Sequence, residues 1–248
     1  CQSPSAWESI ADELATEGRA LCIVNTRKDA RNLTELVIDR FPKSPVIHLS
    51  TNMCAAHRRT VLDLDALKNR MSPCLLISTQ CVEAGVDLDF PVVYRALAPL
   101  DSIAQAAGRC NRGGMGKGRV RVFVPEDAHY PGDKYEQGAQ QTLSLLRERG
   151  SLDPQDPGVF DLYFQRFYGL SAYPGTSQQM ERAIKEADFP EVARLYRLIE
   201  HRNVLHVIVP YVGAPDIPYR LAGAFFRMVQ PFVVEANRKD ATLSPWLG

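Results

Sequence analysis

Residues 74–90 read CLLISTQCVEAGVDLDF, and this stretch decides the fold. Its first four residues, from Cys74 to Ile77, are apolar, which predicts a buried strand. Short polar residues follow at once from Ser78, and a glycine and acidic residues come later in the stretch. This abrupt change at the end of a strand raises the possibility of a binding loop at the edge of a sheet.

Similar apolar runs lie on both sides of this stretch. They predict further strands at 19–24, 45–49, 91–94 and 119–124. Helices are expected between these strands, the first opened by a capping box of Thr26 and Asp29, the others at about 54–70 and 102–111. Apolar strands that alternate with helices predict an α/β fold with a mostly parallel sheet and helices on both faces.

Polar clusters follow three of the predicted strands. These are Asn25-Thr26, Ser50-Thr51 and Ser78-Thr79-Gln80. Ligands of parallel sheets bind beyond the carboxyl ends of the strands. We therefore expect the three clusters to line one rim of the sheet.

Beyond Pro125 the alternation becomes less regular. The expected elements are helices at 134–149, 159–170, 190–200 and 217–229, a linker at 171–179, and strands at 204–209 and 232–234. The tail therefore reads as a small α+β domain. The predicted divisions are a first domain at 1–128, a helical connector at 129–180 and a C-terminal accessory domain at 181–248.

Composition limits the possible functions. Of the 248 residues, 29 are basic and 29 acidic, so no overall cationic field draws the chain to nucleic acid, and phosphate contacts must gather in a groove. No apolar stretch reaches the ~18 residues of a membrane span, and no signal peptide is recognisable. The six cysteines form no CxxC pair, which favours buried thiols in a reducing cytoplasm over a metal site. A start at Cys1 rather than Met suggests a piece of a longer protein.

The helix expected at 102–111 carries a polar stripe. Asp101, Gln105, Arg109 and Arg112 fall within about 80° of one another at helical spacing. Forked, permanently charged guanidinium groups suit phosphate oxygens. An ordinary solvated face is the alternative, but the stripe lacks the lysines and glutamates that are usual on such a face.

These residues carry a resemblance to a known family. STQCVEAGVDLDF at 78–90 and QAAGRCNR at 105–112 resemble motifs V and VI of superfamily-two helicases, and more narrowly those of the CRISPR-associated helicase–nuclease of type I interference systems, the Cas-three family. Three further stretches are similar to the same family: ALCIVNTRKDA at 20–30, HLSTNMCAAHR at 48–58 and FFRMVQPFVV at 225–234. Ala106, where many helicases have arginine, suits this branch better than general helicases.

The resemblance implies roles for individual residues. Arg112 matches the arginine finger for the γ-phosphate of ATP, Arg109 is its companion, and Gln105 positions nucleotide or water. Gly85 and Asp87 are expected beside the nucleotide. Glu83 is expected to hold the geometry of the loop and to couple hydrolysis to movement. Contacts to nucleic acid are implied for Thr26, Ser50, Thr51, Arg58, Ser78, Thr79 and Gln80.

Other motifs of such enzymes do not occur in the sequence. There is no GxxxxGK[ST] phosphate loop, DELA at 12–15 is no plausible box for Mg²⁺, and no His-Asp pair exists. The resemblance therefore implies a second RecA-like domain and a C-terminal domain. ATP and Mg²⁺ would be shared with a first RecA-like domain, and a transition metal would belong only to a nuclease domain, both outside this chain. The chain alone is expected to be inactive.

The leading interpretation is part of a 3′-to-5′ single-stranded DNA translocase that degrades foreign DNA in type I CRISPR interference. Its expected partners are single-stranded DNA, the RNA-guided surveillance (Cascade) complex, the N-terminal half of the same protein and an anti-CRISPR inhibitor. Two alternatives stay open: a general superfamily-two helicase fragment, and a non-catalytic binding module.

Overall fold

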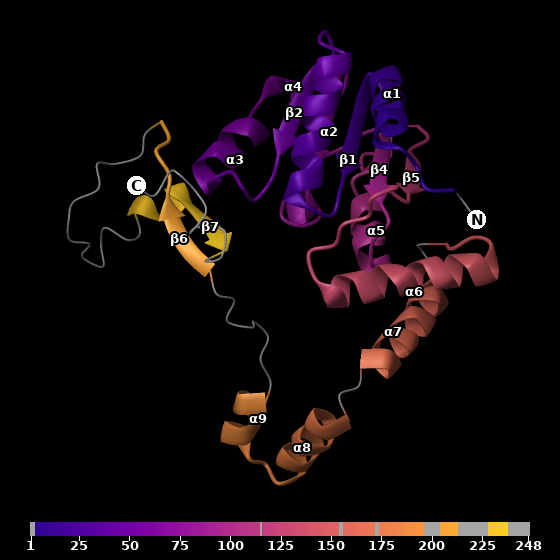
Figure 1. Ribbon diagram of the computed structural model, residues 1–248, viewed down its shortest axis with the longest axis vertical. Coiled ribbons are helices and arrows are strands. Elements are labelled where there is room, and N and C mark those ends of the chain that lie inside the picture. The colour runs from indigo at the N-terminus through magenta and orange to yellow at the C-terminus, as the bar shows by residue number, and fades with distance from the viewer. Residues whose placement is uncertain are drawn as a thin grey trace.

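The computed structural model describes residues 3–114, 116–153, 156–171, 174–195, 204–212 and 228–237. Within them, five parallel strands form one sheet in the order β2-β3-β1-β4-β5 (Figure 1). The strands are β1 (Arg19–Ile23), β2 (Val46–Leu49), β3 (Cys74–Ser78), β4 (Val92–Ala96) and β5 (Arg119–Phe123). The predicted α/β fold with a mostly parallel sheet is confirmed.

Helices cover both faces of this sheet. Successive side chains of a strand point to opposite faces, so β1 contributes Ala20 and Cys22 to one core and Leu21 and Ile23 to the other. The first core is closed by α1 (Trp7–Glu17) and α2 (Arg27–Arg40). The second is closed by α3 (Ala55–Leu62), α4 (Asp65–Lys68), the 3₁₀ turn η1 (Gln80–Val82) and α5 (Leu100–Ala107).

Most predicted elements are found, with three differences. Thr26 caps α2 as expected, since its side chain accepts a hydrogen bond from the Asp29 N–H at 3.1 Å. The helix expected at 54–70 is two helices, α3 and α4, and α1 was not foreseen. The linker expected at 171–179 is wrong over most of its length, because α8 (Pro174–Lys185) begins there.

The remaining elements follow the parallel sheet in the chain. Helices α6 (Asp133–Arg149) and α7 (Pro157–Ser171) lie beside α5, and α9 (Phe189–Leu195) follows α8 (Figure 1). Strands β6 (Val204–Ile208) and β7 (Val233–Asn237) pair antiparallel, with the 3₁₀ turn η2 (Gln230–Phe232) before β7. Cys1, and the expected helix at 217–229 except its last two residues, lie outside the described residues. The domain divisions at 128 and 180 stay a prediction.

The N-terminal helix α1 is joined to edge strand β5 by charge. Arg119 pairs with Glu17, and Arg121 pairs with Glu13. Just before α1, the Ser5 N–H donates to Val124 O at 2.7 Å in an isolated parallel bridge. The Glu126 N–H donates back to Ser5 O at 3.1 Å, so the segment ahead of β1 is bonded to the chain just after β5.

Among the described residues, no helix combines the length and the apolar character needed to cross a bilayer.

Candidate functional site

The three polar clusters of the sequence meet at one rim. Strands β2, β3 and β1 are neighbours in the sheet, and their carboxyl ends lie side by side. Gln80 Nε2 donates to Asn25 O at 2.9 Å, and Ser78 Oγ donates to Leu49 O at 2.8 Å. The Ser78-Thr79-Gln80 cluster is thus bonded to the chain at the ends of both neighbouring strands, β1 and β2.

The hydroxyl groups at this rim differ in their accessibility. Ser50 and Ser78 are fully buried, and both hydroxyls are engaged within the protein, Ser50 with His48 Nε2 at 3.0 Å. Thr79 is also buried, but its Oγ1 has no hydrogen-bond partner among the described residues. A buried hydroxyl without a partner costs ~1–3 kcal/mol. The Thr79 hydroxyl is therefore the buried rim group that gains most from a ligand.

Arg95 of β4 is the largest fully buried side chain, and the sequence analysis missed it. Its Nη2 lies 2.8 Å from Oε1 of Glu83, and Nη1 donates to Asn25 Oδ1 at 2.7 Å. Nη2 also donates to the Tyr135 hydroxyl of α6 at 2.5 Å. The sequence did carry a signal for this residue, because Arg95 interrupts the apolar run of 92–98. Arginine is rarely buried without a partner, so such a position indicates a buried ion pair.

Glu83 is held from two directions. Its carboxylate faces Arg95, although the approach of Nη2 to Oε1 is not aligned as a hydrogen bond. Burial raises the pKa of this carboxyl group, and the charge of Arg95 opposes that rise. Its backbone carbonyl accepts from Arg109 Nη2 at 2.6 Å. Glu83 therefore joins the loop after β3 both to β4 and to the segment after α5.

The helical stripe predicted at 101–112 is corrected by the structure. Helix α5 ends at Ala107 with Gly108 as its C-cap, so Arg109 and Arg112 lie beyond the helix. Arg109 is 9% exposed and donates from Nε to Val82 O at 3.0 Å as well as to Glu83. Burial lowers the pKa of Arg109, and nearby Arg112 lowers it further. Arg109 thus binds the loop at 79–87 rather than facing outward.

Arg112 is the accessible cation of the pair. Its side chain is 49% exposed, and Nη1 lies 3.2 Å from Oδ1 of Asp87, which is itself 91% exposed. Gly85, with φ of 73°, has open space where a side chain would be. Gln105 of α5 is exposed. An accessible guanidinium group beside a glycine turn is suited to an anionic ligand such as a nucleotide phosphate.

Metal ligands are not gathered at this rim. Nowhere in the described part of the chain do three His, Cys, Asp or Glu side chains come together as a metal site.

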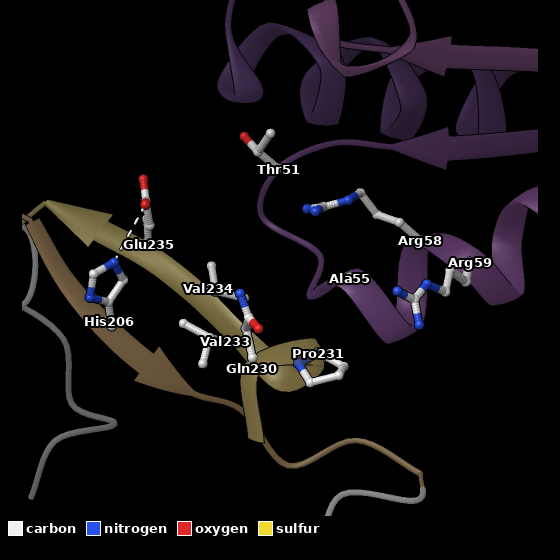
Figure 2. A pocket seen from close by; sticks show the side chains of 10 residues that line it. All are labelled: Thr51, Ala55, Arg58, Arg59, His206, Gln230, Pro231, Val233, Val234 and Glu235. Carbon is white, nitrogen blue, oxygen red and sulfur yellow. Dashed lines mark ion pairs between the residues drawn. The ribbon is translucent and has the colours of Figure 1, made fainter. Parts of the chain in front are cut away.

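A cleft of about 580 Å³ separates α3 from the two-stranded sheet (Figure 2). Its α3 side carries Arg58 and Arg59, and Thr51 from the rim also lines it. Figure 2 shows the Arg58 guanidinium reaching from α3 into this space, where Nη1 also donates to Met53 O at 2.6 Å. Gln230 and Val234 line the opposite wall. The cleft therefore continues the polar rim toward the β6–β7 sheet.

Part of the chain matches a known protein family. Residues 16–115 match the family model described as CRISPR-associated nuclease/helicase Cas3, C-terminal. The Cas3 of Haloferax volcanii is 44% identical over 102 residues, which are 39% of this chain and 11% of the relative. The Cas3 of Streptococcus thermophilus is 32% identical over 111 residues, 43% of this chain and 12% of the relative.

Solved structures show that the likeness in fold extends further along the chain. The T. fusca Cas3–ATP crystal structure aligns with a TM-score of 0.64 and 19% identity, over 97% of this chain and 34% of that chain. A chain of a structure described as a CRISPR RNA-guided surveillance complex, pre-nicking, aligns with a TM-score of 0.59 and 22% identity, over 90% of this chain. The chain thus spans about a third of these structures, and the comparisons support a C-terminal portion of a CRISPR-associated nuclease/helicase Cas3, with the family match confined to residues 16–115.

Proposed function

We propose that this chain is the second RecA-like domain and C-terminal domain of an ATP-dependent translocase that moves 3′-to-5′ on single-stranded DNA. In the complete protein, a first RecA-like domain would supply the phosphate loop and the Mg²⁺ carboxylates, and a nuclease domain would degrade the foreign DNA. One observation carries the proposal. The segments 78–90 and 109–113 meet at the carboxyl rim, where Arg109 bonds the loop of 79–87 and leaves Arg112 accessible.

Arg112 is proposed to stabilise negative charge on the transferring phosphoryl group of ATP. The Arg112 side chain is half exposed. It pairs with Asp87, whose side chain is still more exposed. A nucleotide phosphate can therefore displace that carboxylate at little cost, since exposed ion pairs contribute only ~0–1 kcal/mol. Bound Mg²⁺-ATP supplies the phosphoryl group that is transferred to water.

The other residues near the proposed nucleotide site are proposed to position the loop and the nucleotide. Arg109 has donors committed to Val82 and Glu83, so it fixes the loop that carries Gly85 and Asp87. Gln105 of α5 is exposed and is proposed to position nucleotide or water. Glu83, held by Arg95 and Arg109, is the proposed link from this loop to the rest of the sheet.

DNA is proposed to lie along the rim and into the cleft beside α3. Thr51 and Arg58 line that cleft, and Thr79 offers a hydroxyl without a partner among the described residues. Gln80 and Thr26 lie half exposed at the neighbouring strand ends. Ser50 and Ser78 would reach DNA only if their internal bonds opened. Hydroxyl and amide contacts of this kind bind a backbone without reading its sequence.

Recruitment by an RNA-guided surveillance complex is part of the proposal. Its support is a shared fold: 90% of this chain aligns with a chain from the structure of such a complex.

The test is ATP hydrolysis stimulated by single-stranded DNA. We expect no activity from this chain alone and full stimulation when the N-terminal half of the protein is supplied, because the catalytic groups are divided between the two. Arg112→Ala in the complete protein should lower the turnover rate by ~10³-fold or more while DNA binding persists. Stimulated hydrolysis by this chain alone, or wild-type turnover by the variant, would refute the proposal.

A further inference from the structure

The loop that carries Arg112 leaves α5 by a sharp turn. The Phe90 N–H donates to Arg109 O at 3.0 Å, and the Asn111 N–H donates to Phe90 O at 2.9 Å. Asn111 has a φ of 48°, the left-handed conformation that asparagine tolerates better than most residues. The chain is therefore anchored on both sides of Cys110 to the end of the 78–90 segment.

Asp89 holds the next two residues of this loop. The Arg112 N–H donates to its Oδ1 at 2.9 Å, and the Gly113 N–H donates to its Oδ2 at 3.0 Å. Both oxygens of one carboxylate are thus used on consecutive backbone groups. The Asp89 side chain is only 14% exposed, so these charge-assisted bonds are partly shielded from water.

Arg70 fixes the carboxylate from the opposite side. Its Nη2 lies 2.5 Å from Oδ2 of Asp89. The same guanidinium group covers Gly113 so closely that a Cβ built there would lie 2.3 Å from Nη1. A methyl group at 113 would therefore displace the end of the Arg70 side chain, and Arg70 and Asp89 together enclose the backbone of the loop.

We propose that Asp89 is a positioning residue for Arg112, acting through the loop backbone, with Arg70 as its support. This inference rests on the proposed function, because it gives Arg112 the role of the arginine finger. Asp87 and Asp89 then have separate tasks: Asp87 meets the guanidinium group of Arg112, and Asp89 holds the peptide from which that side chain extends. An arginine with four rotatable bonds reaches a phosphate reproducibly only if its backbone is fixed.

The test uses Asp89→Asn in the complete protein. Asparagine keeps the size of the side chain but offers one acceptor oxygen, so one backbone bond and the ion pair with Arg70 are lost. We expect the turnover rate of DNA-stimulated ATP hydrolysis to fall ~10–100-fold, the cost of a small misplacement, while the KM for ATP and DNA affinity stay unchanged. Asp63→Asn, which breaks an exposed pair with Lys68, is the matched control and should keep wild-type turnover.

Coupling to Arg112 separates positioning from a merely structural role. In an Arg112→Ala background, Asp89→Asn should lower the residual rate no further, since residues that act as a unit are not additive. Hydrogen exchange of the peptide spanning 110–114, measured without nucleotide, should be faster in Asp89→Asn than in wild type. Equal losses in both backgrounds would overturn the proposal.

Gly113→Ala gives a second, independent variant, because its methyl group displaces Arg70 without removing either acceptor oxygen. It should also lower the turnover rate, and by less than Asp89→Asn does. Wild-type turnover in both variants, with Arg112→Ala inactive, overturns this inference and leaves the proposed function standing. Wild-type turnover in Arg112→Ala overturns both.

Discussion

The five-stranded sheet and the β6–β7 sheet are stabilised in different ways. Every residue of β1 and β3 is buried, with helices on both faces, whereas no described side chain of β6 or β7 is fully buried. The smaller sheet meets the rest of the protein where η2, just before β7, packs on α3, and where Arg27 Nη1 donates to Glu235 O at 3.5 Å. His57 of α3 also stacks on Tyr211 with 5.0 Å between ring centroids. The first sheet thus has its own core, and the second depends on a shared surface beside the cleft.

The largest effect is expected from Arg95→Met. It removes the buried cation and leaves Glu83 without its partner, so the free energy of unfolding should fall by about 3–5 kcal/mol. Urea denaturation followed by circular dichroism measures this change. Arg31→Met, which breaks an exposed pair with Glu35, is the control and should cost less than ~0.5 kcal/mol. A loss below that of the control would show that the buried pair contributes nothing.

Truncating an apolar side chain in each sheet compares them directly. Leu76 of β3 is fully buried, so Leu76→Ala should cost about 2–5 kcal/mol through the cavity it leaves. Val207 of β6 is half-buried, so Val207→Ala should cost about 1 kcal/mol or less. Thermal unfolding of the two variants checks the difference, and similar losses would mean that the sheets share one core.

Acid should act on the larger sheet through His48. The two ring nitrogens lie 3.2 Å from Thr34 Oγ1 and 3.0 Å from Ser50 Oγ, and burial lowers the pKa of the ring from the ordinary 6.5. Below pH 6.5 the unfolded chain binds this proton more readily than the folded one. The free energy of unfolding should therefore fall as pH drops from 6.5 toward the lowered pKa.

Replacing this histidine removes the titration. In His48→Gln the urea midpoint of unfolding should depend less steeply on pH over the same interval. The total change in the free energy of unfolding with pH should be smaller than the loss caused by Leu76→Ala. A slope identical to wild type would mean that other groups carry the acid sensitivity.

The smallest effect is expected from His57→Ala. It removes the stack on Tyr211, and aromatic pairs of this kind contribute ~0.5–1.5 kcal/mol. Hydrogen exchange should become faster in residues 204–212 and stay unchanged in β1 and β3. Met71→Ala, at an 89% exposed position, is the control. Faster exchange throughout the chain would contradict the division between the two sheets.

The parallel sheet could be read from the sequence because its signal is local. Apolar runs at 19–24 and 74–77 predicted β1 and β3 to within one residue, and the polar residues after them lie at one rim as expected. Helix α8 was missed because Pro and Gly read as a linker, although proline suits the first turn of a helix. Helix α1 carries Ile10 and Leu14 at helical spacing, a signal that was present and not used.

The geometry of the site could not be predicted from the sequence, because it depends on contacts between residues that are distant in the chain. Spacing alone placed Arg109 and Arg112 on one helical face, but Gly108 ends α5 and the two arginines separate, one buried and one accessible. The pairing of Arg95 with Glu83 follows from the packing of β4 against the loop after β3, which no local pattern encodes. Burial of the Ser50 and Ser78 hydroxyls likewise follows from strand order.

The charged contact between α1 and β5 has a practical consequence for anyone dividing this protein into fragments. A version trimmed to begin at Arg19 would strip Glu13 and Glu17 from Arg121 and Arg119 and remove Ser5 from its bridge beside Val124. Val124 O and the Glu126 N–H, just after β5, would then lose their backbone partner, and the loss of Ile10, Ala11 and Leu14 would expose apolar side chains on one face of the sheet. Exposed apolar patches promote aggregation, so poor solubility of that shortened fragment would reflect the uncovered core rather than a defect in the rim.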